Sequence, residues 1–159
     1  MLRLLVAAIL PIVPLCWSLP TPGSLQQVDG FGANPAKVGF YIYVPKKLNA
    51  NPAIVVLPHA CHGTAQGHFK NSPYMNLAEE RNFIAIYPNS PHISDGCWDV
   101  SSRATLAHNG GGDSNSIANM VQWTISNYKV DQRRVFVAGV SSGAMMTVNH
   151  DNSGIGTEY

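Results

Sequence analysis

The pentapeptide at residues 139–143 reads G-x-S-x-G, with Ser141 at its centre. This pattern is typical of a sharp turn between a strand and a helix, in which the serine hydroxyl stands clear of the sheet. Glycine suits both ends, because a side chain there would crowd the turn. We therefore predict that Ser141 is a nucleophile for acyl transfer and that the backbone N–H of Ser142 faces the developing oxyanion. A Gly/Ser turn without chemistry is the alternative.

A second donor for the oxyanion is expected in the loop after an earlier strand. Residues 57–63 occupy that position, and we assign the donor to Cys61 or its neighbour. His59, Cys61 and His62 are also ligand types for zinc. Three ligands within four residues do not easily close round one ion, so no metal is expected.

The elements around these residues alternate between strand and helix. Short apolar runs rich in branched side chains predict strands buried on both faces, and apolar stripes at helical spacing predict helices. Strands are expected at 39–45, 53–58 and 83–88, each ending at its proline, and at 134–139; helices are expected at 73–81 after Ser72, at 113–128 with Asp113 or Ser114 as cap, and at 144–148. The order indicates an α/β fold with a mostly parallel sheet.

Length and composition limit the class of protein. A chain of 159 residues allows one domain, and 45% hydrophobic against 12% charged residues excludes disorder over most of the length. The formal net charge is +1 and falls to zero if Arg3 is removed with a leader. Nucleic acid and acidic membrane surfaces are therefore excluded as expected partners.

Residues 1–18 have the layout of a secretory signal peptide, with Arg3, a short apolar run and a small residue at Ser18. The run is too short, and too interrupted by proline, to span a membrane. We therefore expect a secreted, extracellular protein. Cleavage after Ser18 leaves only Cys61 and Cys97, which predicts one disulfide in an oxidising compartment; two unpaired buried thiols are the alternative.

Several segments together resemble the secreted acetylxylan and feruloyl esterases of the polyhydroxybutyrate-depolymerase-like family. They are residues 23–28, 41–45, 97–102, 108–116 and 141–147. The resemblance implies an α/β-hydrolase fold and removal of acetyl or feruloyl groups from xylan, with Ser141 as nucleophile and oxyanion contacts near Cys61. It implies acetylated xylan as partner and a monomeric enzyme without a cofactor.

The end of the chain departs from the family pattern. Triads of this fold run in the order Ser, Asp or Glu, His, but residues 142–159 hold only His150, Asp151 and Glu158, in the wrong order. His150 would lie about 13 Å along a helix from Ser141, out of reach. We therefore expect residues 19–148 to be the N-terminal part of an esterase domain with an incomplete C-terminal half, and residues 149–159 to be an aberrant tail.

Two consequences follow from a missing half. The chain as given would lack the acid and base and be inactive, and the strand at 135–138 would form a bare apolar edge. Acetyl specificity is favoured and feruloyl specificity is the alternative; a non-catalytic, carbohydrate-binding fragment that stacks sugars on Trp98 is a third reading. Asp99, Asp113 and the remaining histidines are expected to be structural.

Overall fold

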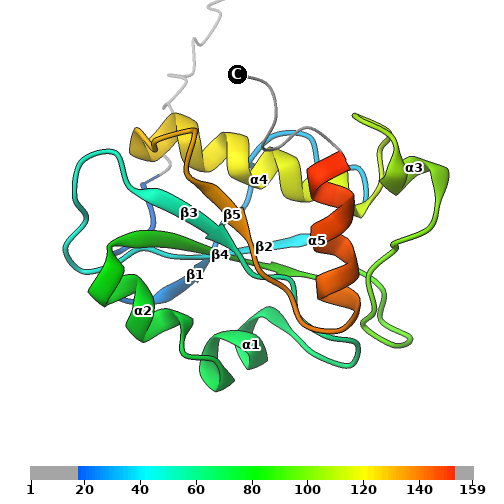
Figure 1. Ribbon diagram of the computed structural model, residues 1–159, viewed down its shortest axis with the longest axis horizontal. Coiled ribbons are helices and arrows are strands. Elements are labelled where there is room, and N and C mark those ends of the chain that lie inside the picture. Colours follow the sequence, from blue (N-terminus) through cyan, green and yellow to red (C-terminus); the bar gives the residue numbers. More distant parts are fainter. Residues whose placement is uncertain (1–17, 153–159) are drawn as a thin grey trace, which may run out of the picture.

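One five-stranded sheet forms the middle layer of the structure, a computed structural model that describes residues 18–152 (Figure 1). Its strands are β1 (Leu25–Gln27), β2 (Gly39–Tyr43), β3 (Ala53–Val56), β4 (Phe83–Asn89) and β5 (Val135–Val137). They lie in the order β1-β2-β4-β3-β5. The β3–β4 and β3–β5 pairs are parallel, whereas β1–β2 and β2–β4 are antiparallel, so the sheet is mixed. The predicted α/β class is confirmed, but the expected mostly parallel sheet is not, because β1 and β2 join the parallel strands in antiparallel pairs.

Helices cover both faces of this sheet (Figure 1). They are α1 (Ala65–Asn71), α2 (Tyr74–Arg81), α3 (Arg103–Leu106), α4 (Asp113–Tyr128) and α5 (Ser142–Asn152). The alternation along β4 divides the core in two. Ile84 and Ile86 belong to the cluster that includes Ile117 of α4 and Met146 of α5, while Ala85 and Tyr87 belong to the cluster with α1 and α2. Every residue of β4 except the last is buried, as expected of the central strand.

The structure differs from the sequence-based expectations at several elements. The strand β1 and the helices α1 and α3 were not predicted, and α2 begins at Tyr74, with Pro73 rather than Ser72 as its cap. β4 continues through Pro88, which pairs with Phe40 of β2. The proline is tolerated because the ladder with β3 on the other side ends at Ile86, so no pairing there needs its missing N–H.

The predicted signal peptide lies almost wholly outside the described residues, as does the end of the predicted tail. α5 runs on to Asn152, so the first residues of that tail continue the helix. Within residues 18–152, no helix is long and apolar enough to cross a membrane.

The outer edge of β5 exposes apolar side chains. Among the described residues β5 pairs with β3 on one side and with no strand on the other. Phe136 is 55% exposed, and Val140, Met145 and Val148 on the following turn and α5 are exposed as well. The bare apolar edge predicted from the sequence is confirmed for this part of the chain. An open edge without charge or proline is a template for pairing with another strand.

We expect Phe136→Glu to reduce self-association of the chain at high concentration, because a carboxylate on an edge strand opposes pairing. Ile93→Glu is the matched control, since Ile93 is fully exposed in a loop and lies on no strand. Light scattering over a concentration series should show less association for Phe136→Glu only. Equal association of both variants and the parent would refute the role of the edge.

Candidate active site

Residues 139–143 form the sharp turn between β5 and α5. β5 ends at Val137 and α5 begins at Ser142, two residues earlier than expected. Ser141 lies between them with a φ of 55°, in the left-handed region, and its side chain is exposed. The carbonyl of Ser141 accepts from the N–H of Ala144 at 2.9 Å, and that of Val140 from Gly143 at 2.9 Å. The hydroxyl is thus presented at the first turn of a helix.

The two glycines allow close approach of three backbone segments. A Cβ on Gly139 would overlap the carbonyl of Gly143, and a Cβ on Gly143 would overlap the carbonyl oxygen of Pro58 and lie 2.7 Å from that of His59. The turn therefore packs directly against the segment that follows β3. Only glycine fits at these positions, as the sequence pattern implied.

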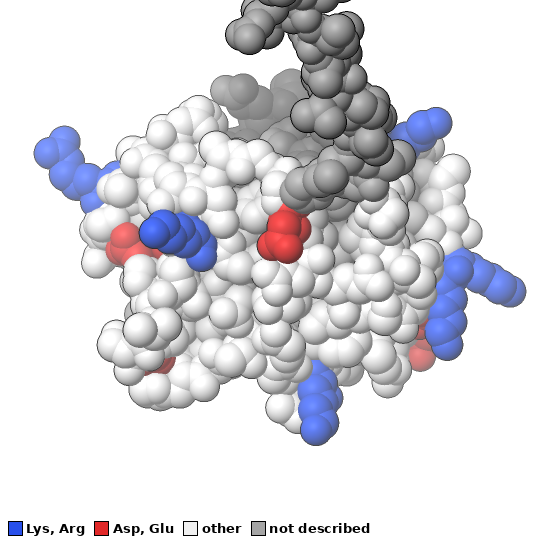
Figure 2. All heavy atoms as spheres, turned by 180° about the vertical axis from the view of Figure 1, so that it is seen from behind, with Lys and Arg blue, Asp and Glu red and all other residues white. Residues whose placement is uncertain are grey.

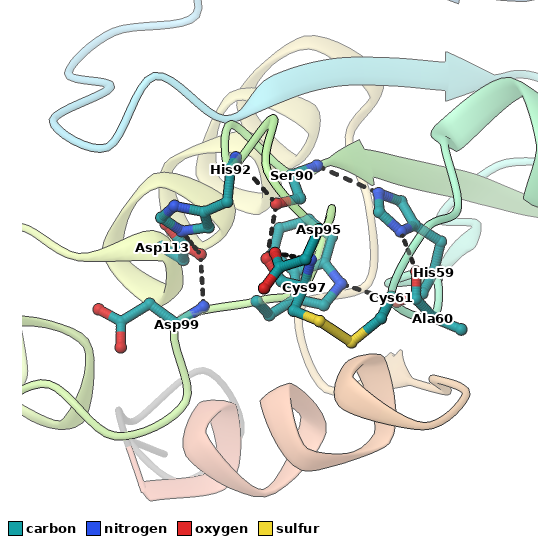
Figure 3. Close-up of a disulfide and its surroundings, with 10 residues drawn as sticks. His59, Ala60, Cys61, Ser90, His92, Asp95, Cys97, Asp99 and Asp113 are labelled. Atoms are coloured by element: carbon teal, nitrogen blue, oxygen red, sulfur yellow. Dashed lines mark hydrogen bonds and ion pairs between the residues drawn. A yellow bond between two sulfur atoms is a disulfide. The ribbon is translucent and has the colours of Figure 1, made fainter.

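The loop that contains Cys61 is fixed from two sides. A disulfide joins Cys61 to Cys97 (Figure 3), which confirms the predicted pairing. The N–H of His62 donates to the carbonyl of Asp95 at 2.6 Å. Ser142 is buried and is the first residue of α5, so its N–H has no acceptor within the helix. The contact of Gly143 with Pro58 and His59 brings the Cys61 loop to this helix end.

His59 is a structural residue that joins this loop to the segment after β4. Its Nδ1 lies 2.7 Å from the carbonyl of Ala60, and its Nε2 accepts from the N–H of Ser90 at 3.1 Å (Figure 3). Burial lowers the pKa of His59, although the bond to Ala60 opposes the shift. Because both ring nitrogens are engaged in hydrogen bonds within the protein, His59 has a structural role and is not available as a base.

Trp98 lies in the core behind the disulfide. Its side chain is 4% exposed, its indole N–H donates to the carbonyl of His59 at 2.8 Å, and its ring centroid lies 5.0 Å from that of His59. Stacking on a sugar needs an exposed ring face, which this conformation does not offer. The packing alternative therefore describes Trp98 better than the sugar-binding surface.

Asp113 makes a hydrogen bond with His92 that the sequence did not reveal; the Asp113 side chain is buried, whereas the His92 side chain is exposed. Its carboxylate lies 3.0 Å from Nε2 of His92 and accepts from the N–H of Asp99 at 2.9 Å (Figure 3). The cap of α4 is Gly112, so the predicted cap role of Asp113 or Ser114 is wrong. Asp113 instead anchors the loop after β4 to the start of α4. His92 lies 21 residues away in a polar loop, and no local pattern connects the two.

A known esterase family matches most of this chain. The family model described as esterase PHB depolymerase matches residues 38–150. The chain belongs to the esterase PHB depolymerase family. Acetylxylan esterase A of Emericella nidulans is 62% identical over 128 residues, and acetylxylan esterase A of Aspergillus awamori is 65% identical over 125 residues. The solved acetyl xylan esterase from Aspergillus awamori superposes with a TM-score of 0.78 at 63% identity. The resemblance drawn from the sequence segments is confirmed.

The matches cover most of this chain but less than half of each relative. The match with the Emericella nidulans esterase covers 80% of this chain and 42% of that protein, and the match with the Aspergillus awamori esterase covers 79% of this chain and 41% of that protein. The solved structure is covered over 46% of its length. The chain therefore spans less than half the length of each of these relatives.

Among residues 18–152, no group of three or more His, Cys, Asp or Glu side chains is arranged to hold an ion. Cys61, one of three candidate zinc ligands, is bound to Cys97.

Removing the disulfide is expected to destabilise the fold substantially. The bridge closes a loop with a sequence separation of 36, and the chain-entropy model gives roughly 4 kcal/mol for such a loop. The Cys61→Ser/Cys97→Ser double variant should lose about this free energy of unfolding in urea titrations. Adding a reductant should lower the unfolding midpoint of the parent but should not change that of the double variant. A double variant whose midpoint equals that of the oxidised parent would contradict the prediction.

Acidification is expected to weaken the fold through His59 and His68. Burial lowers the pKa of both from 6.5, so below that pH the unfolded chain binds protons that the folded chain does not. The free energy of unfolding should therefore fall as pH drops from 6.5 toward the folded-state pKa values, by at most about 1.4 kcal/mol per pH unit for each histidine. Urea titrations at several pH values measure the slope. His59→Asn and His68→Asn should each flatten it; a slope unchanged in both would exclude these residues.

Proposed function

We propose that this chain carries the nucleophile of a secreted carboxylic ester hydrolase that removes acetyl groups from xylan. The observation that carries the proposal is the exposed, left-handed Ser141 between β5 and α5, packed against the Cys61 loop. Relatives at 62% and 65% identity are named acetylxylan esterase A, which favours acetyl over feruloyl esters. The non-catalytic reading placed sugar stacking on Trp98, and that side chain is buried.

The proposed mechanism is a two-step acyl transfer. The hydroxyl oxygen of Ser141 attacks the ester carbonyl carbon, and its proton passes to a general base. The N–H groups of Ser142 and Cys61 stabilise the tetrahedral oxyanion. When it collapses to an acetyl-serine, the base returns the proton to the departing oxygen, and the sugar leaves as an alcohol. Water then attacks the acetyl-serine, returning the serine and releasing acetate. The reaction balances without a cofactor.

His59, His68 and His92 are not assigned as the general base. His59 uses both ring nitrogens in structural bonds, Nδ1 of His68 lies 3.1 Å from the carbonyl of Leu57, and Nε2 of His92 is paired with Asp113. The base and the acid of the complete enzyme are proposed to come from the part of the family sequence that this match does not cover. The chain alone should then acylate Ser141 slowly and turn over very little.

Secretion is part of the proposal. The layout of residues 1–18 supports it. The disulfide between Cys61 and Cys97 supports it independently, because such bonds persist in oxidising compartments.

The test is the site of acetylation by p-nitrophenyl acetate. Oxyanion contacts alone retain roughly 10³-fold acceleration over water in enzymes that have lost their triad, so Ser141 should be acetylated faster than any exposed serine. Mass spectrometry of the peptide that contains Ser141 measures this. Ser141→Ala should abolish the modification, whereas Ser24→Ala, at an exposed serine near β1, should keep it. Acetylation spread evenly over surface lysines and serines would refute the proposal.

A further inference from the structure

Two adjoining hollows lie beside the C-terminal half of α4. Their volumes are about 460 and 280 Å³, and both are lined by Trp123 and Asn127. Residues 26–30 line the first hollow and residues 31–33 the second, so together the hollows follow one stretch of chain along the helix. We call this feature the Trp123 groove.

The α4 wall of the groove is a stripe of uncharged hydrogen-bonding side chains. Its members recur at helical spacing, which places them on one face: Asn119, Gln122, Trp123, Ser126 and Asn127. Gln26 and Gln27 face them from the other wall, with Asp29 as the one charged residue among those that line the two hollows. Neither lysine nor arginine appears in either described lining. Figure 2 shows the basic side chains of one face spread around its rim, with no extended basic patch.

Several of the amides are already held in place. Nδ2 of Asn119 donates to the carbonyl of Ala33 at 2.6 Å, and Nδ2 of Asn127 donates to the carbonyl of Trp123 at 2.7 Å. An amide side chain has two donors and two acceptor lone pairs, so one such bond leaves most of its capacity for a ligand. These side chains are therefore pre-oriented, which lowers the entropic cost of binding.

The chemistry of this lining suits a neutral sugar chain. A sugar offers many hydroxyls, which amides bind as donors and acceptors, and apolar ring faces, which can pack on the part of the Trp123 side chain that the core leaves exposed. An anionic ligand would meet Asp29 with no cation in the lining to offset it, and a wholly apolar ligand would desolvate the amides. We propose that the Trp123 groove binds a stretch of xylan backbone as a non-catalytic subsite.

The groove lies far from Ser141 in the sheet order. It borders β1, at one edge, whereas Ser141 follows β5, at the opposite edge (Figure 1). A polysaccharide chain held at the groove would therefore raise the local concentration of its acetyl groups without occupying the turn at residues 139–143. The choice of xylan rests on the proposed function; the preference for a neutral sugar chain rests on the lining alone.

Affinity electrophoresis in gels that contain soluble xylan tests this inference. Xylan should retard the parent chain, and Gln122→Ala/Asn127→Ala should bind about tenfold more weakly, the loss expected for two ordinary hydrogen-bonding side chains. Both positions are exposed, so the variant should fold. Trp123→Phe is a second groove variant and should also bind xylan more weakly than the parent. It keeps an aromatic ring against Phe40, so it should fold. Gln66→Ala, at an exposed position on α1, is the control and should bind like the parent.

The outcomes separate the two proposals. Xylan should retard Ser141→Ala as much as the parent. If it does, and p-nitrophenyl acetate nevertheless fails to acetylate Ser141 in the parent, the proposed function is refuted and the proposal of a xylan-binding groove is not. A parent chain that xylan does not retard, or groove variants that bind like Gln66→Ala, would overturn the inference. Stronger retardation by polygalacturonate than by xylan would also overturn it, because the lining disfavours an anionic chain.

Discussion

Gly143→Ala is expected to destabilise the chain by about 3 kcal/mol or more, enough to unfold a domain of ordinary stability. The new methyl group would overlap the carbonyl oxygen of Pro58 and lie 2.7 Å from the carbonyl oxygen of His59. Neither group can move freely. The His59 ring is bound to Ser90, and the adjacent Cys61 is bound to Cys97. The clash is therefore with rigid backbone rather than with a flexible side chain.

Gly67→Ala is the matched control for this substitution. Gly67 lies within α1, and a Cβ there would meet only Oγ1 of Thr64, at 3.1 Å. Alanine gains up to about 1 kcal/mol over glycine inside a helix, which offsets this contact. Urea titrations should show a large loss for Gly143→Ala and a change within about 1 kcal/mol for Gly67→Ala. Equal midpoints for the two variants would mean that the turn does not pack on Pro58 as described.

The strands and the turn were predictable because their signals are local. Residues 83–88 form an unbroken apolar run, and β4 is buried along almost all of its length. The G-x-S-x-G pattern after a strand marks a tight turn, and Gly139 is required within it because a Cβ there would overlap Gly143. The packing of Gly143 on Pro58, by contrast, is a tertiary contact that the local sequence does not show.

The elements missed in the sequence are those stabilised by tertiary contacts. α1 is short, has Gly67 in its interior and shows no apolar stripe; the Thr64 cap and the packing of Phe69 on Tyr43 and Tyr87 hold it. β1 is three residues long and depends on its pairing with β2. In the same way, Asp113 looks like a cap because helix starts favour aspartate, yet its partner His92 comes from another loop. Sequence spacing carries no record of such pairs.

Ser141→Gly is expected to abolish acylation while raising stability. Ser141 has a φ of 55°, a conformation that costs a residue with a Cβ about 1 kcal/mol and glycine almost nothing. Strained backbone conformations are typical of active sites, where they hold a reactive side chain in position and lower the stability of the fold. The free energy of unfolding should therefore rise by up to about 1 kcal/mol, and the peptide that contains residue 141 should no longer be acetylated.

Lys129→Gly separates the effect of backbone strain from that of chemistry. Lys129 has a similar φ of 51° at the end of α4, remote from the turn at residues 139–143. Both glycine variants should be stabilised alike in urea titrations, but only Ser141→Gly should lose acetylation. If Lys129→Gly gains stability and Ser141→Gly does not, then the left-handed conformation of Ser141 does not lower the stability of the fold. If Ser141→Gly retains acetylation at that peptide, the nucleophile is another residue and the hydrolase mechanism fails with it.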